Sequence, residues 1–203
     1  MTAFMKNKEL RPAFTKSVYE AAVEILGSRE AGVIFGDSHT ASSGRYSDIS
    51  AMPDDLLAEM SNEFIIKYHV NTARGLMIRI GEASFNILRR KFDEINDMGN
   101  IENRLCSFEK KLQDTLQRLV TFISLVSDIP LELEKINQGR YCLNLSKKGI
   151  DKSTGDLPSY YFAGLLRAFS TWLDSRQNYS IEVLQQDDAQ LIFQTCLTVK
   201  PAQ

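Results

Sequence analysis

The spacing of apolar residues changes once along this chain, and that change limits the fold more than any other feature. Up to Ser127, apolar residues recur every three or four positions, as on one face of an α-helix. After Pro130 they alternate with polar residues, as in half-buried strands, and one further helical stretch separates two such hairpins. Helices followed by hairpin, helix and hairpin predict an α+β fold with an antiparallel sheet packed on helices.

The expected elements follow from this periodicity and from the residues that interrupt it. Helices are expected over Ala13 to Leu26, Pro53 to near Val70, Asn71 or Thr72 to Ile95, Ser107 to Ser127, and Tyr160 to Leu173. Hairpins are expected over Leu131 to Ser146, turning at Asn137-Gln138-Gly139, and over Tyr179 to Val199, turning at Asp187-Asp188. Polar loops are expected from Gly36 to Ser50 and from Lys147 to Asp156.

The composition fits one globular domain. The chain has 203 residues, 43% hydrophobic and 25% charged, so a single domain over residues 1–203 is expected, with an ordered core over about residues 14–199. The net charge of -2 without a dense basic run argues against nucleic-acid binding. No apolar stretch approaches the roughly 20 residues of a membrane span, and the N-terminus lacks an apolar signal region. We therefore expect a cytoplasmic protein.

The cysteines and histidines offer little for a metal site. Cys106, Cys142 and Cys196 lie far apart in the sequence, so we expect reduced, buried thiols and no metal. Of the two histidines, His69 could act as an axial haem ligand or a pH-responsive group, although a partly buried, hydrogen-bonded histidine is the simpler interpretation. Haem is accordingly not the expected cofactor.

One short motif suggests hydrolysis. The block Gly36-Asp37-Ser38 after Val33 to Phe35 resembles the Gly-Asp-Ser motif of the GDSL/SGNH hydrolases, in which a serine follows a strand and attacks an ester. Such a serine needs a histidine base, which that family supplies late in the chain, but no histidine follows His69 here. A turn capped by Asp37 and Ser38 is therefore the favoured interpretation, and an enzyme is not the leading hypothesis.

Glycines inside a predicted helix require an explanation. Gly75 and Gly81 lie, with Ser84, in the helix that follows Asn71, where glycine costs about 1 kcal/mol relative to alanine. Either a close helix contact or a ligand lying against the backbone would account for them. The helices also carry an excess of aromatic residues, which are typical of a core and equally of an apolar pocket.

Two segments resemble the 4-vinyl reductase-like family, also called hydrocarbon-binding proteins. Asn71 to Phe85 resembles the family's Arg-Gly, then Arg-x-Gly-x-Ala-x-Phe helix, and Phe162 to Trp172 with Tyr179 to Val183 resembles its Gly-Leu-Leu helix and final hairpin. The resemblance implies an α+β fold shared with TRAPP small subunits and guanylate-cyclase-associated sensor domains, an interior ligand cavity and dimers. Ser159 and Leu191 stand near the positions of family cysteines, which argues against a cysteine-bound metal or cluster.

These observations lead to a ligand-binding or sensor protein that holds an apolar small molecule, such as a lipid, hydrocarbon or pigment, in an interior cavity. Arg74 or Arg79 would anchor an acidic head group, and Gly81 and Gly164 would give the ligand room. The remaining expected ligand-binding residues are Met77, Phe85, Phe122, Phe162, Leu166 and Phe169. A homodimer and a separate signalling partner are expected. The alternative is a non-catalytic dimerising interaction module with a filled core.

Overall fold

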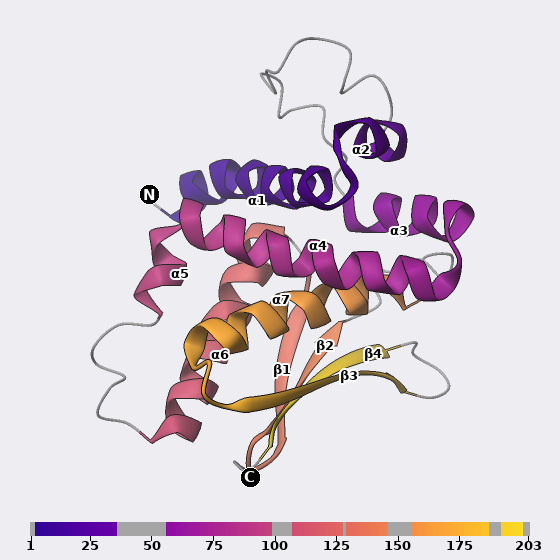
Figure 1. The fold of residues 1–203 in the computed structure, drawn as a ribbon. Coiled ribbons are helices and arrows are strands. Elements are labelled where there is room, and N and C mark those ends of the chain that lie inside the picture. Colours follow the sequence, from indigo (N-terminus) through magenta and orange to yellow (C-terminus); the bar gives the residue numbers. More distant parts are fainter. Residues whose placement is uncertain are drawn as a thin grey trace.

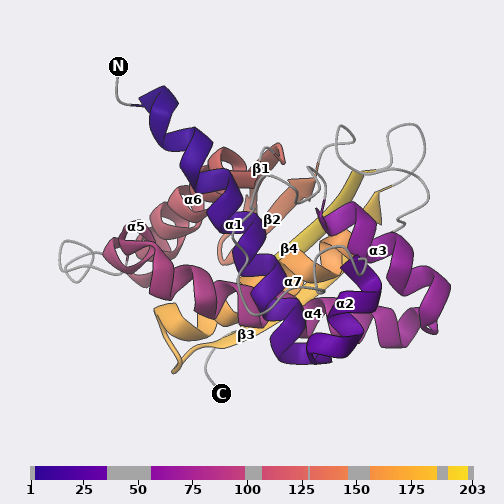
Figure 2. The same ribbon diagram turned by 90° about the horizontal axis from the view of Figure 1, so that it is seen from above.

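The molecule has two layers, a helical layer and a four-stranded antiparallel sheet (Figure 1). The computed structural model describes residues 3–35, 56–98, 107–127, 129–145, 156–186 and 192–200. The expected α+β class is confirmed. Seen from above, α1 runs obliquely across the helical layer, with the sheet beneath (Figure 2). The chain order within the described ranges is α1(Ala3–Leu26), α2(Ser28–Phe35), α3(Leu56–Lys67), α4(Val70–Lys91), α5(Asp93–Asp97), α6(Phe108–Ser127), β1(Leu131–Asn137), β2(Arg140–Leu145), α7(Leu157–Leu173), β3(Asn178–Gln186) and β4(Ile192–Lys200).

Two helix boundaries differ from the expectation for local reasons. Helix α1 begins at Ala3 and contains Pro12, so it starts ten residues before the Ala13 expected from the apolar spacing. The helix expected from Asn71 to Ile95 ends at Lys91, because Phe92 takes an extended conformation (φ −121°) and separates α4 from the short α5. The C-terminal end of α1 agrees with the prediction, since Gly27, which follows it, adopts a positive φ of 84°.

The segment before Gly36 is helical. Ser28–Phe35 forms α2, with Ile34 and Phe35 buried, so no strand leads into the Gly36-Asp37-Ser38 block. A helix therefore stands where the GDSL/SGNH hydrolases have the strand that precedes their serine. The Gly-Asp-Ser block itself, His39, Cys106, Leu191, the turn Asp187-Asp188 and most of both predicted polar loops lie outside the described residues.

Helices α4 and α7 approach each other at backbone distance. A Cβ atom added to Gly81 would lie 2.0 Å from the Tyr161 carbonyl oxygen, and one added to Gly164 would lie 1.9 Å from the Ile78 carbonyl oxygen. Each glycine therefore receives the backbone of the opposite helix, which no side chain would allow. Of the two explanations open for Gly81, the close helix contact is what the structure shows.

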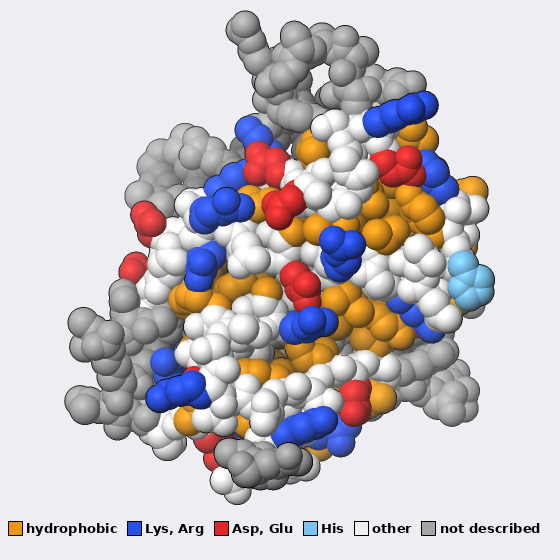
Figure 3. Space-filling view, viewed as in Figure 1, with side chains coloured by type: hydrophobic (Ala, Val, Ile, Leu, Met, Phe, Trp, Pro, Cys, Tyr) orange, Lys and Arg blue, Asp and Glu red, His pale blue; other side chains and the backbone are white. Residues whose placement is uncertain are grey.

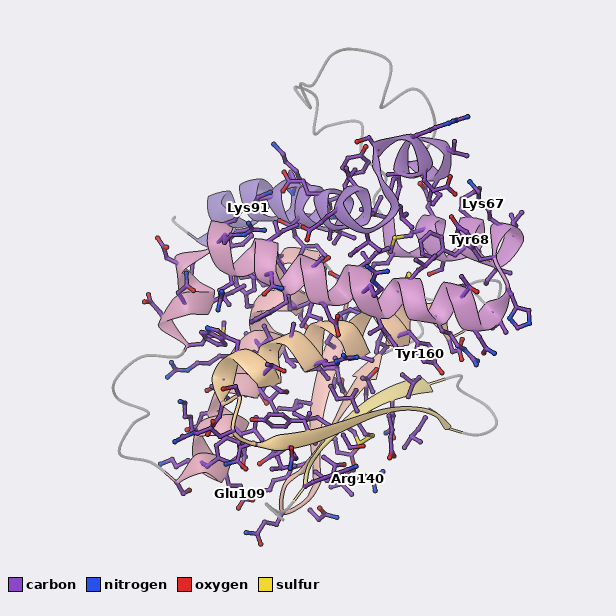
Figure 4. All side chains as sticks on the ribbon, viewed as in Figure 1. Lys67, Tyr68, Lys91, Glu109, Arg140 and Tyr160 are labelled. Carbon is purple, nitrogen blue, oxygen red and sulfur yellow. A yellow bond between two sulfur atoms is a disulfide. The ribbon has the colours of Figure 1, made fainter. Side chains whose placement is uncertain are left out.

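Ion pairs fasten the outer helices to this central pair. Glu20 on α1 meets Lys91 at the end of α4 with a 2.6 Å N···O distance. Glu30 on α2 receives both the Lys67 ammonium and the Tyr68 hydroxyl at the end of α3, and these hydrogen bonds lower the pKa of Glu30. Figure 4 shows Lys91 and the Lys67 and Tyr68 pair at opposite ends of the helical layer.

The sheet has the order β1-β2-β4-β3, and its registers place one face against the helices. Tyr141 opposes Leu197 and Leu143 opposes Thr195, and all four side chains are buried. The Thr195 hydroxyl donates to the Ser159 carbonyl of α7 at 3.0 Å, which links the centre of the sheet to that helix. The β1–β2 turn lies where the sequence predicts it, and Gly139 has a positive φ of 77°.

The same register brings two buried cysteines together between β2 and β4. Cys142 on β2 stands directly opposite Cys196 on β4, with a Cα–Cα distance of 4.1 Å, and the two form a disulfide. The expectation of reduced thiols is wrong for this pair. The spacing of 54 residues hid the contact, because a strand register, not sequence proximity, creates it. No helix within the described ranges is long and apolar enough to cross a membrane.

The glycine contact predicts a large and selective loss of stability. Gly81→Ala and Gly164→Ala place a methyl group on opposing backbone, so each should lower the free energy of unfolding by about 3 kcal/mol. Gly75→Ala is the matched control within α4: nothing lies within 4 Å of its added Cβ, and it should stabilise by about 0.5–1 kcal/mol. Urea unfolding measures all three, and equal effects at Gly75 and Gly81 would contradict the contact.

The disulfide predicts a chemical and a thermodynamic result. Under denaturing conditions, prior reduction should add two to the number of alkylated cysteines seen by mass spectrometry. Because the bond closes a loop with a sequence separation of 54, reduction should lower the free energy of unfolding by about 4 kcal/mol. An unchanged alkylation count would show that the thiols are reduced after all.

Candidate ligand-binding site

The expected apolar site residues come from three helices and are all buried. Met77 and Phe85 lie on α4, Phe122 lies on α6, and Phe162, Leu166 and Phe169 lie on α7. Helix α7 presents apolar side chains on most of its circumference because it is covered by α4 on one side and by the sheet on the other (Figure 1). The residues thus occupy the interior between the two layers.

The aromatic members form separate groups within this interior. Phe85 and Phe169 meet edge to face with ring centroids 5.9 Å apart, and Trp172 packs beside both. Phe122 instead pairs with Phe92 at 5.2 Å, on the α6 side. The structure therefore brings Phe85 and Phe169 together, and places Phe122 in a different ring contact.

The two glycines do not leave open room. The space that a side chain would fill at Gly81 and Gly164 is occupied by the Tyr161 and Ile78 backbones. We expected these glycines to give a ligand room, and this packing corrects that expectation. Their role is to let α4 and α7 approach closely.

Arg74 is already engaged by neutralising partners. Its guanidinium forms two hydrogen bonds with Asp156, just before α7, and lies 5.0 Å from the centre of the Tyr160 ring. The hydrogen bond that Arg74 donates to Asp156 raises the pKa of Arg74, and partial burial acts in the opposite direction. Figure 4 shows Tyr160 at the edge of α7 beside α4. Arg74 therefore clamps the start of α7, and the other candidate anchor, Arg79, is exposed.

Buried hydroxyl groups at the contact between α4 and α7 were missed as site residues. The Ser84 and Tyr161 hydroxyls are buried neighbours of each other, and neither oxygen makes a hydrogen bond of regular geometry; the buried Ser159 hydroxyl makes none either. Burial raises the pKa of the Tyr161 phenol above its usual range, while the neighbouring Ser84 hydroxyl acts in the opposite direction. A buried hydroxyl without a partner costs about 1–3 kcal/mol. The signal in the sequence was a polar serine within an apolar helical stretch, but its partnering could not be determined there.

Other donor groups within the described chain are few. His69 is exposed at the start of α4, where its Nδ1 accepts the Asn71 N–H at 3.4 Å, so it serves as a helix cap. Cys142 and Cys196 are bonded to each other. The described ranges contain no group of three or more His, Cys, Asp or Glu side chains that could hold a metal ion. The fully buried interior donors include the phenols of Tyr141 and Tyr161 and the thioethers of Met60 and Met77.

Comparison with known proteins finds similarity at the level of structure. No protein-family model and no curated protein sequence matches the chain. Among solved structures, a Cs H-NOX variant carrying 4-cyano-L-phenylalanine matches with a TM-score of 0.58 and 10% identity, over 94% of this chain and 97% of that one. A T. tengcongensis H-NOX mutant matches with a TM-score of 0.56 and 11% identity, over 94% and 98%.

A third neighbour is described as an oxygen-binding H-NOX domain related to soluble guanylate cyclases. It matches with a TM-score of 0.53 and 9% identity, over 94% of this chain and 95% of that one. These neighbours overturn the resemblance to the 4-vinyl reductase-like family, which rested on short stretches of glycine, arginine and aromatic residues. Such residues recur wherever a helix packs closely against another, so they do not distinguish one family from another.

These structural neighbours also overturn the expectation, drawn from the sequence, that haem is not the cofactor. One neighbouring structure, at 11% identity, concerns haem redox potential and porphyrin distortion, which associates that protein with haem. Haem iron is held by His, Cys, Met or Tyr side chains. The single histidine among the described residues is an exposed helix cap. The described residues therefore do not fit a haem held by histidine.

At 9–12% identity the match concerns architecture. It extends over nearly the whole of both chains and includes the helices as well as the sheet. The chain thus has the fold of the H-NOX domains.

Proposed function

We propose that this chain is a small-molecule-binding domain of the sensor type. The proposal is supported by the fold shared with H-NOX domains over 94% of the chain, one of which is described as oxygen-binding. Shared fold alone does not define a ligand. The observation that carries the proposal to a site is the buried hydroxyl pair of Ser84 and Tyr161 at the contact between α4 and α7, in which neither oxygen makes a hydrogen bond of regular geometry.

The hydroxyl pair provides the polar end of the proposed site. Buried hydroxyl groups in folded proteins are almost always satisfied by protein, by water or by a bound molecule. Tyr161 on α7 is fully buried, and the Ser84 hydroxyl on α4 is its neighbour. A ligand with one hydrogen-bonding group would satisfy both oxygens and recover part of the energy lost by their burial.

Apolar side chains provide the rest of the proposed site. Phe162 packs on the Tyr161 ring with centroids 5.3 Å apart, and Met77, Phe85 and Phe169 are fully buried nearby on the same two helices. Methionine and aromatic side chains adopt new packing around an apolar body more readily than a rigid aliphatic core. The ligand would thus be largely apolar, with haem as the first specific molecule to test because of the neighbours described above.

The proposed signal starts from the same contact. A ligand that enters beside Gly81 and Gly164 must move α4 relative to α7, since their backbones already touch. Helix α7 is linked to β4 through the hydrogen bond from Thr195 to Ser159, so its movement would reach the sheet. A separate signalling protein would read the change.

A second candidate function is a dimerising interaction module. Apolar side chains gather on the surface over α2, α3 and the start of α4, where Figure 3 shows an orange area. Val33, Ile66 and Val70 are 55%, 79% and 46% exposed. Exposed apolar side chains on neighbouring elements are typical of protein contacts, and a homodimer formed through them would account for this surface.

The ligand proposal predicts a saturable 1:1 complex. Native mass spectrometry of the purified protein should show a bound small molecule that is lost on denaturation. Protein isolated without ligand should bind hemin or oleate saturably, followed by absorption or by tryptophan fluorescence. Met77→Ala should weaken binding about tenfold, and the exposed Arg79→Gln should not. Absence of any bound mass together with no saturable binding would overturn the proposal, and a stable dimer would then favour the interaction module.

A pair of tyrosine variants tests the hydroxyl site. Tyr161→Phe removes an oxygen that makes no hydrogen bond of regular geometry, so the ligand-free protein should keep its stability or gain about 1 kcal/mol. Tyr179→Phe is the matched control, because its hydroxyl donates to the Asp174 carbonyl at 3.2 Å and its loss should cost about 1 kcal/mol. Binding of the probe should fall about tenfold for Tyr161→Phe only. Equal affinity in both variants would remove Tyr161 from the site.

A further inference from the structure

A cavity lies far from the α4–α7 contact, at the end of the sheet where β4 ends. Figure 1 shows this end at the bottom of the view, and Figure 4 shows Glu109 there. The cavity has a volume of about 310 Å³, at the lower end of the roughly 300–1,000 Å³ of small-molecule sites. It is lined by Phe108, Glu109, Leu112, Gln138, Gly139, Gln177, Val199 and Lys200.

Four segments that are distant in sequence build this cavity: the start of α6, the β1–β2 turn, Gln177 just before β3, and the end of β4. The first turns of α6 supply Phe108 and Leu112, and the β1–β2 turn supplies Gly139. The end of β4 supplies Val199, whose N–H donates to the Gly139 carbonyl at 2.8 Å. This bond holds the turn against the end of the strand. The cavity walls are thus fixed by backbone structure.

The floor of the cavity is apolar. Leu112 is fully buried in the core, and Phe108 and Val199 are half-buried against it. The side-chain amides of Gln138 and Gln177 contribute polar groups to the same lining. An apolar floor with a few polar groups is the usual construction of a site for a small organic molecule.

The charges at the rim favour an anion. The Glu109 carboxylate is paired with Lys135 at 2.9 Å, and the same ammonium donates to Gln113 at 3.2 Å, so the acidic group is compensated. Lys200 lines the cavity, is exposed, and has no ion pair within the described part of the chain. The cavity therefore combines an apolar floor with one uncompensated positive charge.

We propose that this cavity binds a small organic acid, with its carboxylate toward Lys200 and its flat apolar body on Phe108, Leu112 and Val199. The site shares no lining residue with the proposed interior site, so either can fail without the other. Its ligand class follows from shape and charge together, because the apolar floor accepts the flat body and the lysine favours a carboxylate over a neutral analogue.

A series of three probes of equal shape tests the ligand class. Phenylacetate, phenylacetamide and phenethylamine carry negative, neutral and positive head groups on the same ring. Titration followed by two-dimensional amide NMR should move the resonances of Leu112, Gly139, Gln177 and Val199. Phenylacetate should bind about three- to fivefold more tightly than phenylacetamide, as a rim charge contributes up to about 1 kcal/mol, and phenethylamine should bind most weakly.

Lysine variants test the charge. Lys200→Gln should abolish the preference for phenylacetate over phenylacetamide, and Lys200→Glu should reverse the order so that phenethylamine binds best. Lys110→Gln is the matched control, since Lys110 is an exposed lysine of α6 that does not line the cavity. Because both lysines are on the surface, the variants should keep the amide spectrum of the folded protein. Resonance changes confined to other residues, or equal effects of the Lys200 and Lys110 variants, would overturn the proposal.

Discussion

The close backbone contact between α4 and α7 is the constraint on which the rest of the structure depends. Gly81 and Gly164 each accept the backbone of the opposite helix, so the two axes lie nearer than any pair of larger residues would allow. Helix α1 crosses over α4, and α7 lies on the sheet, so both layers are positioned through this one pair. The aromatic side chains of the interior then fill the volume that the close helices leave on either side.

The same contact creates the chemical feature of the interior. Two helices at backbone distance leave little space to turn a side chain, and the hydroxyls of Ser84 and Tyr161 are buried there without a hydrogen bond of regular geometry. Apolar residues at these two positions would avoid the cost of burying hydroxyl groups. A binding function would explain why hydroxyl groups are present instead. By contrast, Arg74, Glu20 and Glu30 have close ionic partners and act as fasteners between elements.

Much of the fold could be predicted because apolar periodicity is local. The helix over Phe108–Ser127 and the turn at Gly139 occur where the spacing and the glycine indicate. No element was predicted over Ser28–Phe35, where the structure has a helix, because a short apolar run has no clear period. For the site, Met77, Phe85 and Phe169 were correctly expected to be buried, but burial alone does not separate core from pocket.

The sequence by itself determined the order of helices and hairpins, and with it the α+β class, because each element is encoded by the pattern of its own residues. Only the tertiary structure decided which residues meet across the chain. The register between β2 and β4 pairs Cys142 with Cys196, and the packing of α4 on α7 turns two glycines into contact points. The cavity beside Lys200 likewise needs four separate segments at once. Such contacts depend on the relative placement of elements, which no local pattern of residues contains.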